Sequence, residues 1–131
     1  MQEVQAHLRF LRMSPRKVRL VADLIRGNSV TRASNSLSVL NKVAAAPLLK
    51  LLNSAVANAK HNFSLEAGTL KVARITVDGG PALKRWMPKA HGRATPVRER
   101  TSHINLVLGV MEKKAKKENK ADKSKILTQK S

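Results

Sequence analysis

Four histidines and eight acidic residues are the side chains best suited to metal binding or proton transfer in this chain of 131 residues. The histidines are His7, His61, His91 and His103. None belongs to a local set of His, Asp and Glu with metal-ligand spacing, and the absence of cysteine excludes thiolate ligands and disulfides. The acids are dispersed along the chain, which favours no pair of carboxylates for general acid–base work. The sequence therefore predicts no enzyme, no bound metal and no cofactor.

The sequence also lacks a glycine-rich loop of the kind that binds nucleotide phosphates. Such a loop has the spacing G-x-x-x-x-G-K-[ST] and leads into a helix. The Gly-Gly-Pro segment at residues 79–81 is not followed by a helical pattern. We therefore expect no small-molecule substrate.

Charge is the strongest signal in the composition. Lysine and arginine number 26 against 8 acids, giving a formal net charge of +18. Self-repulsion at this charge opposes compaction, so a polyanion is the expected partner. A soluble protein with a solvated basic face is the alternative, but the charge is clustered rather than scattered. No apolar stretch approaches the roughly 18 residues of a membrane span and the first ten residues do not resemble a secretory signal, so we expect no membrane association.

Residues 78–103 form a long, strongly basic segment, which we call the arm. It lies between two apolar, strand-like runs, at residues 70–77 and 104–110. Loops longer than about 12–15 residues are uncommon in compact domains, so the arm is either a disordered loop or an outward continuation of both strands as a hairpin. Residues 79–81 can bend and residues 90–92 can turn, which favours a hairpin reaching ~40 Å. The arm carries six basic residues, namely Lys84, Arg85, Lys89, Arg93, Arg98 and Arg100.

These basic side chains are expected to contact phosphates, which position a protein on nucleic acid without reading its sequence. Trp86, the single tryptophan, either stacks on a base or packs under the start of the arm. His103, at the start of the second apolar run, is interpreted as a structural or RNA-contacting residue rather than a general base. An isolated two-stranded ribbon is marginal in water, so the arm needs a partner outside the chain to order it.

The remaining elements follow from apolar periodicity. Residues 4–10 alternate apolar and polar side chains, which predicts a half-buried strand with Phe10 inward. Ser14 and Pro15 open a helix that ends at Gly27, and a second helix covers residues 30–40. Asn41 is expected to cap a third helix running to about residue 62, with Pro47 kinking its first turns or delaying its start. Its small residues 54–59 suit close approach of another helix or of an RNA backbone.

Three segments resemble a known family, that of the large-subunit ribosomal protein L-twenty-two of bacteria and organelles. They are SPRKVRLVADLIRG at 14–27, SAVANAKHN at 54–62 and the stretch from 77 to 108, within a resemblance that covers about residues 4–110. The third segment is the most specific, with a Lys, a spaced basic residue, a small-x-Gly-Arg turn, and then His followed by alternating apolar residues. Lys89 departs from the Arg or His usual at its position; a phosphate contact survives that change, whereas a bidentate or stacked contact does not.

The resemblance implies an α+β fold, with three helices packed on a small antiparallel sheet and a long protruding β-hairpin. Residues 1–110 would form a single domain that includes the arm. Residues 111–131 are rich in lysine and poor in apolar side chains, and this composition by itself predicts a disordered basic tail. The resemblance further implies a structural role in the large ribosomal subunit, either of a bacterial cytoplasmic ribosome or of an organelle ribosome. The hairpin would run through large-subunit (23S) rRNA, with its tip lining the nascent-peptide exit tunnel, and the protein would bind rRNA early in subunit assembly beside neighbouring ribosomal proteins.

Residues expected to contact rRNA follow position by position. Lys89, His91 and Arg93 would meet tunnel-wall rRNA at the tip, and Arg98 and Arg100 would hold the shaft. The full set of expected rRNA-binding residues is Arg12, Arg16, Lys17, Arg19, Lys84, Arg85, Trp86, Lys89, His91, Gly92, Arg93, Arg98, Arg100 and His103. A solvated helix face is the alternative for the first four. An architectural DNA-binding protein with a β-ribbon arm is the alternative for the whole chain.

Overall fold

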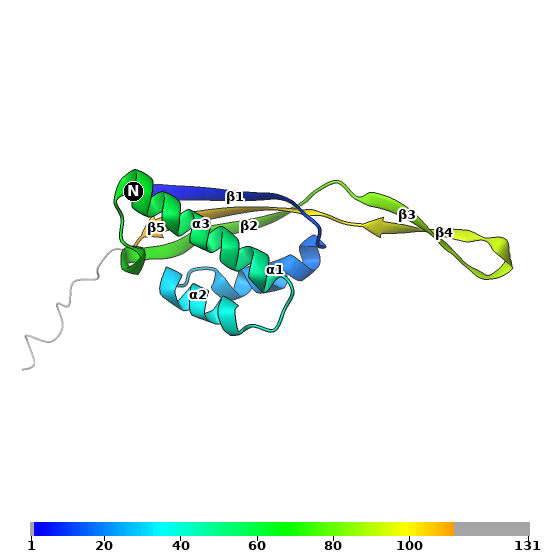
Figure 1. Ribbon diagram of the computed structural model, residues 1–131, viewed down its shortest axis with the longest axis horizontal. Helices are drawn as coiled ribbons and strands as arrows, with labels where there is room; N and C mark the ends of the chain where they lie inside the picture. Colours follow the sequence, from blue (N-terminus) through cyan, green and yellow to red (C-terminus); the bar gives the residue numbers. More distant parts are fainter. Residues whose placement is uncertain (1, 112–131) are drawn as a thin grey trace, which may run out of the picture.

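The structure is a computed structural model that describes residues 2–111. The chain begins with strand β1 (Glu3–Leu11), which is followed by the helices α1 (Pro15–Ile25), α2 (Val30–Val39) and α3 (Ala45–Phe63). Four strands come next, namely β2 (Leu70–Gly79), β3 (Leu83–Pro88), β4 (Ala94–Glu99) and β5 (Ser102–Val110). Single 3-10 turns occur at Ala67–Thr69 and Ala90–Gly92. This confirms the α+β fold with three helices and a protruding hairpin (Figure 1). The predicted disordered tail lies outside the described residues, apart from Met111.

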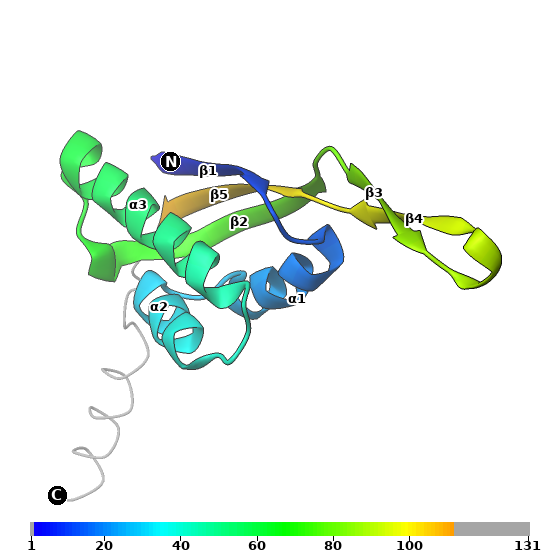
Figure 2. The ribbon, with the colours of Figure 1, turned by 45° about the vertical axis from the view of Figure 1, so that its right-hand side comes forward.

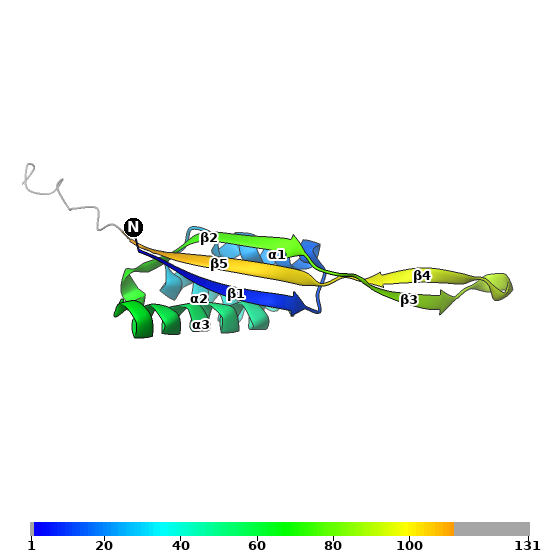
Figure 3. The ribbon, with the colours of Figure 1, turned by 90° about the horizontal axis from the view of Figure 1, so that it is seen from above.

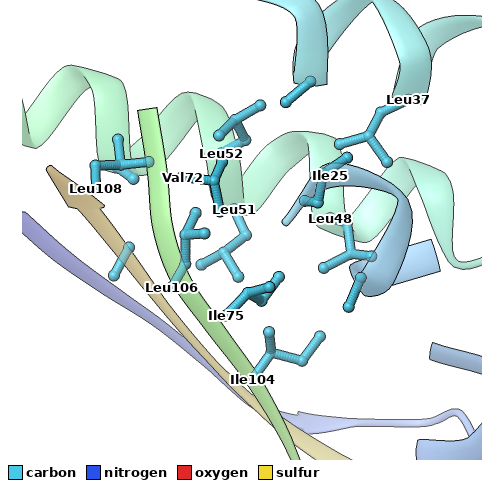
Figure 4. Close-up of a cluster of buried hydrophobic side chains, with 14 of the residues drawn as sticks. Ile25, Leu37, Leu48, Leu51, Leu52, Val72, Ile75, Ile104, Leu106 and Leu108 are labelled. Carbon is cyan, nitrogen blue, oxygen red and sulfur yellow. The ribbon is translucent and has the colours of Figure 1, made fainter. Parts of the chain in front are cut away.

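Strands β1, β5 and β2 form an antiparallel sheet in that order. The helices lie on one side of this sheet (Figure 2), and its other face has no helix across it (Figure 3). Leucine, isoleucine and valine side chains from the helices meet those of the strands in the layer between (Figure 4). Burying this apolar layer against the helices supplies the main stabilisation of the domain.

Helix α1 has the amphipathic pattern that its sequence predicts. Its buried residues are Val18, Val21, Ala22 and Ile25. Leu24, on the neighbouring turn position, is 47% exposed. Pro15 opens the helix after the N-cap residue Ser14, and Gly27 follows its end with φ +77°, a left-handed conformation that glycine adopts without steric cost.

Helix α3 begins late, which is one of the two effects expected of Pro47, but its cap differs from the prediction. Ala44, not Asn41, is the N-cap residue, and Pro47 falls in the first turn, where a missing backbone N–H removes no helical hydrogen bond. Ala55 and Ala59 are fully buried, and α3 contacts β1 and α2. Close helix packing therefore accounts for these two small residues.

Two β-bulges set which side chains face the core. In β2 the register with β5 shifts between Val72 and Arg74, which explains why the buried residues step by three from Val72 to Ile75. In β1 the register shifts between Leu8 and Leu11. Phe10, predicted to point inward, is 63% exposed as a result. The simple period of two fails at both places because each bulge inserts one residue.

Candidate nucleic-acid interface

The arm is a two-stranded antiparallel ribbon of β3 and β4 that projects beyond the domain (Figure 1). It is a separate sheet from that of β1, β5 and β2, because the ladder is interrupted around residues 80–82 and 100–101. The first interruption lies at the bend that the sequence predicts for residues 79–81. Strand β3 is six residues long, so the regular ribbon alone reaches ~20 Å.

The turn at the tip lies where the sequence predicts it. The backbone N–H of Lys89 donates to the carbonyl of Arg93 at 2.7 Å, which closes the loop. His91 and Gly92 have φ of 60° and 66°, and this left-handed pair turns the chain. Lys89, His91 and Arg93 are all exposed, so the tip presents three side chains that can donate hydrogen bonds.

The two faces of the ribbon differ in chemistry. The register places Lys84 opposite Arg98 and Trp86 opposite Pro96, and side chains two residues apart share a face. One face therefore combines two cations with an indole ring that is 70% exposed. This exposure rules out the alternative in which Trp86 packs under the start of the arm. We call this face the Lys84 face.

The opposite face is partly neutral. Leu83 and Val97 are half-buried there. Arg85 lies on the same face, with its Nε 3.8 Å from Glu99 Oε2, and the Arg12 Nη2 donates to the same Glu99 oxygen at 3.0 Å. Glu99 thus ties the ribbon to the chain after β1. Two of the predicted rRNA-binding arginines share this carboxylate.

The arm leaves the domain at Gly80 and Thr101, which we call the arm root. Gly80 N–H donates to the Thr101 carbonyl at 2.8 Å, and the Thr101 hydroxyl donates to the Pro81 carbonyl at 2.7 Å. A Cβ at Gly80 would clash with Thr101 Oγ1 and would lie 3.2 Å from His103 Nε2. Only glycine fits this crossing without displacing its neighbours.

His103 accepts a hydrogen bond from the Phe10 backbone N–H through Nδ1 at 3.1 Å. This contact supports its structural interpretation. Phe10 itself was not among the residues expected to bind RNA. Phe10 continues the apolar alternation of Val4 and Ala6, which predicts a buried side chain. No feature of the sequence indicates the β-bulge that turns Phe10 outward.

The basic residues of α1 divide into two kinds. Arg16 and Lys17 are exposed and reach no carboxylate among the ion pairs described for residues 2–111. Arg19 donates from Nε and Nη2 to the Val77 carbonyl at 3.2 and 3.1 Å, so part of its guanidinium fastens α1 to β2. The remaining predicted residue, Arg100, is exposed at the domain end of β4.

Other kinds of site find no support among the described residues. No group of three His, Cys, Asp or Glu side chains in residues 2–111 could hold a metal ion. No helix in this part of the chain is long and apolar enough to cross a membrane.

Comparison with known proteins identifies the family. The family model described as ribosomal protein L22p/L17e matches residues 6–109. The chain is 53% identical over 114 residues to a large ribosomal subunit protein uL22 of Desulfitobacterium hafniense, covering 87% of this chain and 98% of the relative. It is 55% identical over 106 residues to a uL22 of Mycoplasma capricolum, with 81% and 96% covered. A uL22 of Myxococcus xanthus is 50% identical over 113 residues, with 85% and 99% covered. The chain belongs to the ribosomal protein L22p/L17e family.

Proposed function

We propose that this protein is a structural constituent of the large ribosomal subunit and that it binds large-subunit rRNA mainly through its arm. The relatives described above are named as large ribosomal subunit proteins, and membership of a ribosomal-protein family indicates a structural rather than a catalytic role. The observation that carries the rRNA proposal is the Lys84 face, where like charges lie opposite each other on a ribbon without a core of its own.

The charges of the ribbon favour the binding of an anion. Like charges directly opposite on neighbouring strands are destabilising, and an isolated two-stranded ribbon is marginal in water. A phosphate beside each of Lys84 and Arg98 would replace this repulsion with two attractive contacts. Each neutralised phosphate also releases counterions, which favours binding most strongly at low salt.

The finer placement follows the family resemblance. We propose that the tip residues Lys89, His91 and Arg93 contact rRNA at the wall of the nascent-peptide exit tunnel, near the nascent peptide. Their exposure at the far end of a projecting ribbon supports this placement. The exposed cations Arg16 and Lys17 would add contacts from the domain during early subunit assembly, beside neighbouring ribosomal proteins. Residues 1–110, including the arm, would act as one rRNA-binding unit, with residues 111–131 as a basic extension.

Co-sedimentation and competition binding test this function. Tagged full-length protein expressed in a bacterium should sediment with large ribosomal subunits after a high-salt wash. In competition, unlabelled large-subunit rRNA should displace labelled rRNA from the protein at far lower concentration than duplex DNA does. Preference for duplex DNA would instead support an architectural DNA-binding protein.

A further inference from the structure

None of the chain's three aromatic residues lies in the core. The two phenylalanines and one tryptophan are Phe10, Phe63 and Trp86, and they are 63%, 44% and 70% exposed. Aromatic side chains normally dominate cores because they bury large apolar areas. Here the core uses aliphatic side chains only, so the aromatic rings are available to a partner.

Phe10 is turned out of the core by the β1 bulge. Leu8 pairs with Ile104 and Leu11 pairs with Ser102, so Arg9 and Phe10 both lie opposite His103. Phe10 has φ 55°, a left-handed conformation that a bulky residue rarely adopts. Such backbone strain persists only where surrounding contacts hold it, and it occurs preferentially at functional positions.

His103 supplies those contacts. Its ring packs edge-to-face with the Phe10 ring, with centroids 4.8 Å apart and an interplanar angle of 89°. Its Nδ1 also accepts the Phe10 backbone N–H. The phenyl ring is therefore held in one orientation while most of its surface stays open to solvent.

The ring lies on the helix-free face of the sheet, close to the arm root. His103 alternates with the buried Ile104, so its side chain points to the face that no helix covers (Figure 3). His103 Nε2 also lies 3.2 Å from the position of a Gly80 Cβ, which places the pair beside the arm root. Exposed Arg9 directly precedes Phe10 on the same strand. His7 and Asn105, 2.8 Å apart, occupy the next positions on this face.

We propose that Phe10 is a stacking platform for an unpaired nucleobase of rRNA at the arm root, with Arg9 on an adjacent phosphate. This inference rests on the proposed rRNA-binding function and adds a base-contacting site on the domain. A nucleobase is the occupant that matches both features, a rigidly held open ring and a cation beside it, because stacked bases carry phosphates within reach. A protein partner would need an apolar surface around the ring, whereas the nearby positions on this face carry the polar residues Arg9, His7 and Asn105.

The test measures binding of full-length protein to a transcript of large-subunit rRNA over a range of salt concentrations. Phe10→Leu removes the aromatic face while keeping apolar bulk, and should lower affinity on the order of 10-fold. The slope of log affinity against log salt should not change, because no phosphate contact is lost. Phe63→Leu is the matched control, the same substitution at the other phenylalanine, and should bind like the wild type.

A second variant separates binding from folding. Phe10→Gly relieves the left-handed strain, so its thermal stability should equal or exceed that of Phe10→Leu while its rRNA affinity falls further. If Phe10→Leu and Phe10→Gly both bind rRNA as tightly as the wild type, the stacking site is overturned, and the ring faces something other than RNA. If the wild type itself fails to bind rRNA, the proposed function fails instead.

Discussion

Lys84 lies directly opposite Arg98 in the arm, so two cations face each other across a ribbon that has no hydrophobic core. Trp86 shares their face and Pro96 is its cross-strand neighbour. Opposite charges at such a pair would stabilise the ribbon, whereas like charges destabilise it. The pair of like charges therefore destabilises the arm in the free protein. An anion bound along this face would remove that destabilisation.

Reversing one of these charges should have opposite effects on folding and binding. Lys84→Glu places a carboxylate opposite Arg98, which should stabilise the free ribbon by roughly 0.2–1 kcal/mol. Amide hydrogen exchange in β3 and β4 should slow accordingly. The same variant should bind rRNA more weakly because a phosphate contact becomes a repulsion.

Lys50→Glu on α3 is the matched control, since it makes the same charge change at an exposed position of the domain. Arm amide exchange should be unaffected by it. Faster exchange in the Lys84→Glu arm would mean that the cross-strand pair is not repulsive in the free protein.

Removing the outer part of the arm should leave the domain folded. Residues 85–93 contribute no side chain to the core, so their deletion should change the melting temperature by no more than a few degrees. Affinity for rRNA should fall sharply because three basic residues are lost, namely Arg85, Lys89 and Arg93. Circular dichroism melting and rRNA binding of the same preparation check both expectations. A large loss of thermal stability would show that the arm helps to hold the domain together.

The arm root should tolerate no side chain at Gly80. Gly80→Ala places a Cβ against Thr101 Oγ1 and the His103 ring, and should cost on the order of 1–3 kcal/mol through the displacement of both. Gly68→Ala is the control, because a Cβ there meets nothing within 4 Å and its φ is not left-handed. Urea unfolding of the two variants measures the difference, and equal stabilities would contradict the tight crossing.

The aliphatic core should respond to truncation as a closely packed interior does. Leu52 on α3 is fully buried, so Leu52→Ala should destabilise the domain by about 2–5 kcal/mol. Leu20→Ala, at a side chain that is 72% exposed on α1, should change stability by less than ~0.5 kcal/mol. Chemical denaturation of both variants checks the assignment of the core, which a small effect at Leu52 would refute.

Local patterns predicted much of this fold because they act through local physics. Ser14, Pro15 and Gly27 bound α1 as expected, and the turn at residues 90–92 follows from His91 and Gly92, whose residue types adopt left-handed conformations more readily than most. The arm was recognisable as a hairpin because an overlong basic loop between two strands has few other solutions.

The interface was less predictable because its chemistry depends on register. No sequence pattern indicates that Lys84 faces Arg98 while Arg85 meets Glu99, since a shift of one residue would exchange the two faces. Phe10 was assigned to the core for the same reason, because a bulge cannot be read from alternation. Arg19 was counted with the other cations of α1, although long-range hydrogen bonds to Val77 occupy part of its guanidinium.

The salt dependence of rRNA binding tests the central claim that the Lys84 face neutralises rRNA phosphates. Wild type and the double variant Lys84→Ala/Arg98→Ala are titrated with a large-subunit rRNA transcript across a series of salt concentrations. Each lost phosphate contact should reduce the slope of log affinity against log salt by about 0.7–0.9, so the double variant should lose roughly 1.5. If the double variant has the same slope and affinity as the wild type, the claim is contradicted, because Lys84 and Arg98 would then make no contact with rRNA phosphates.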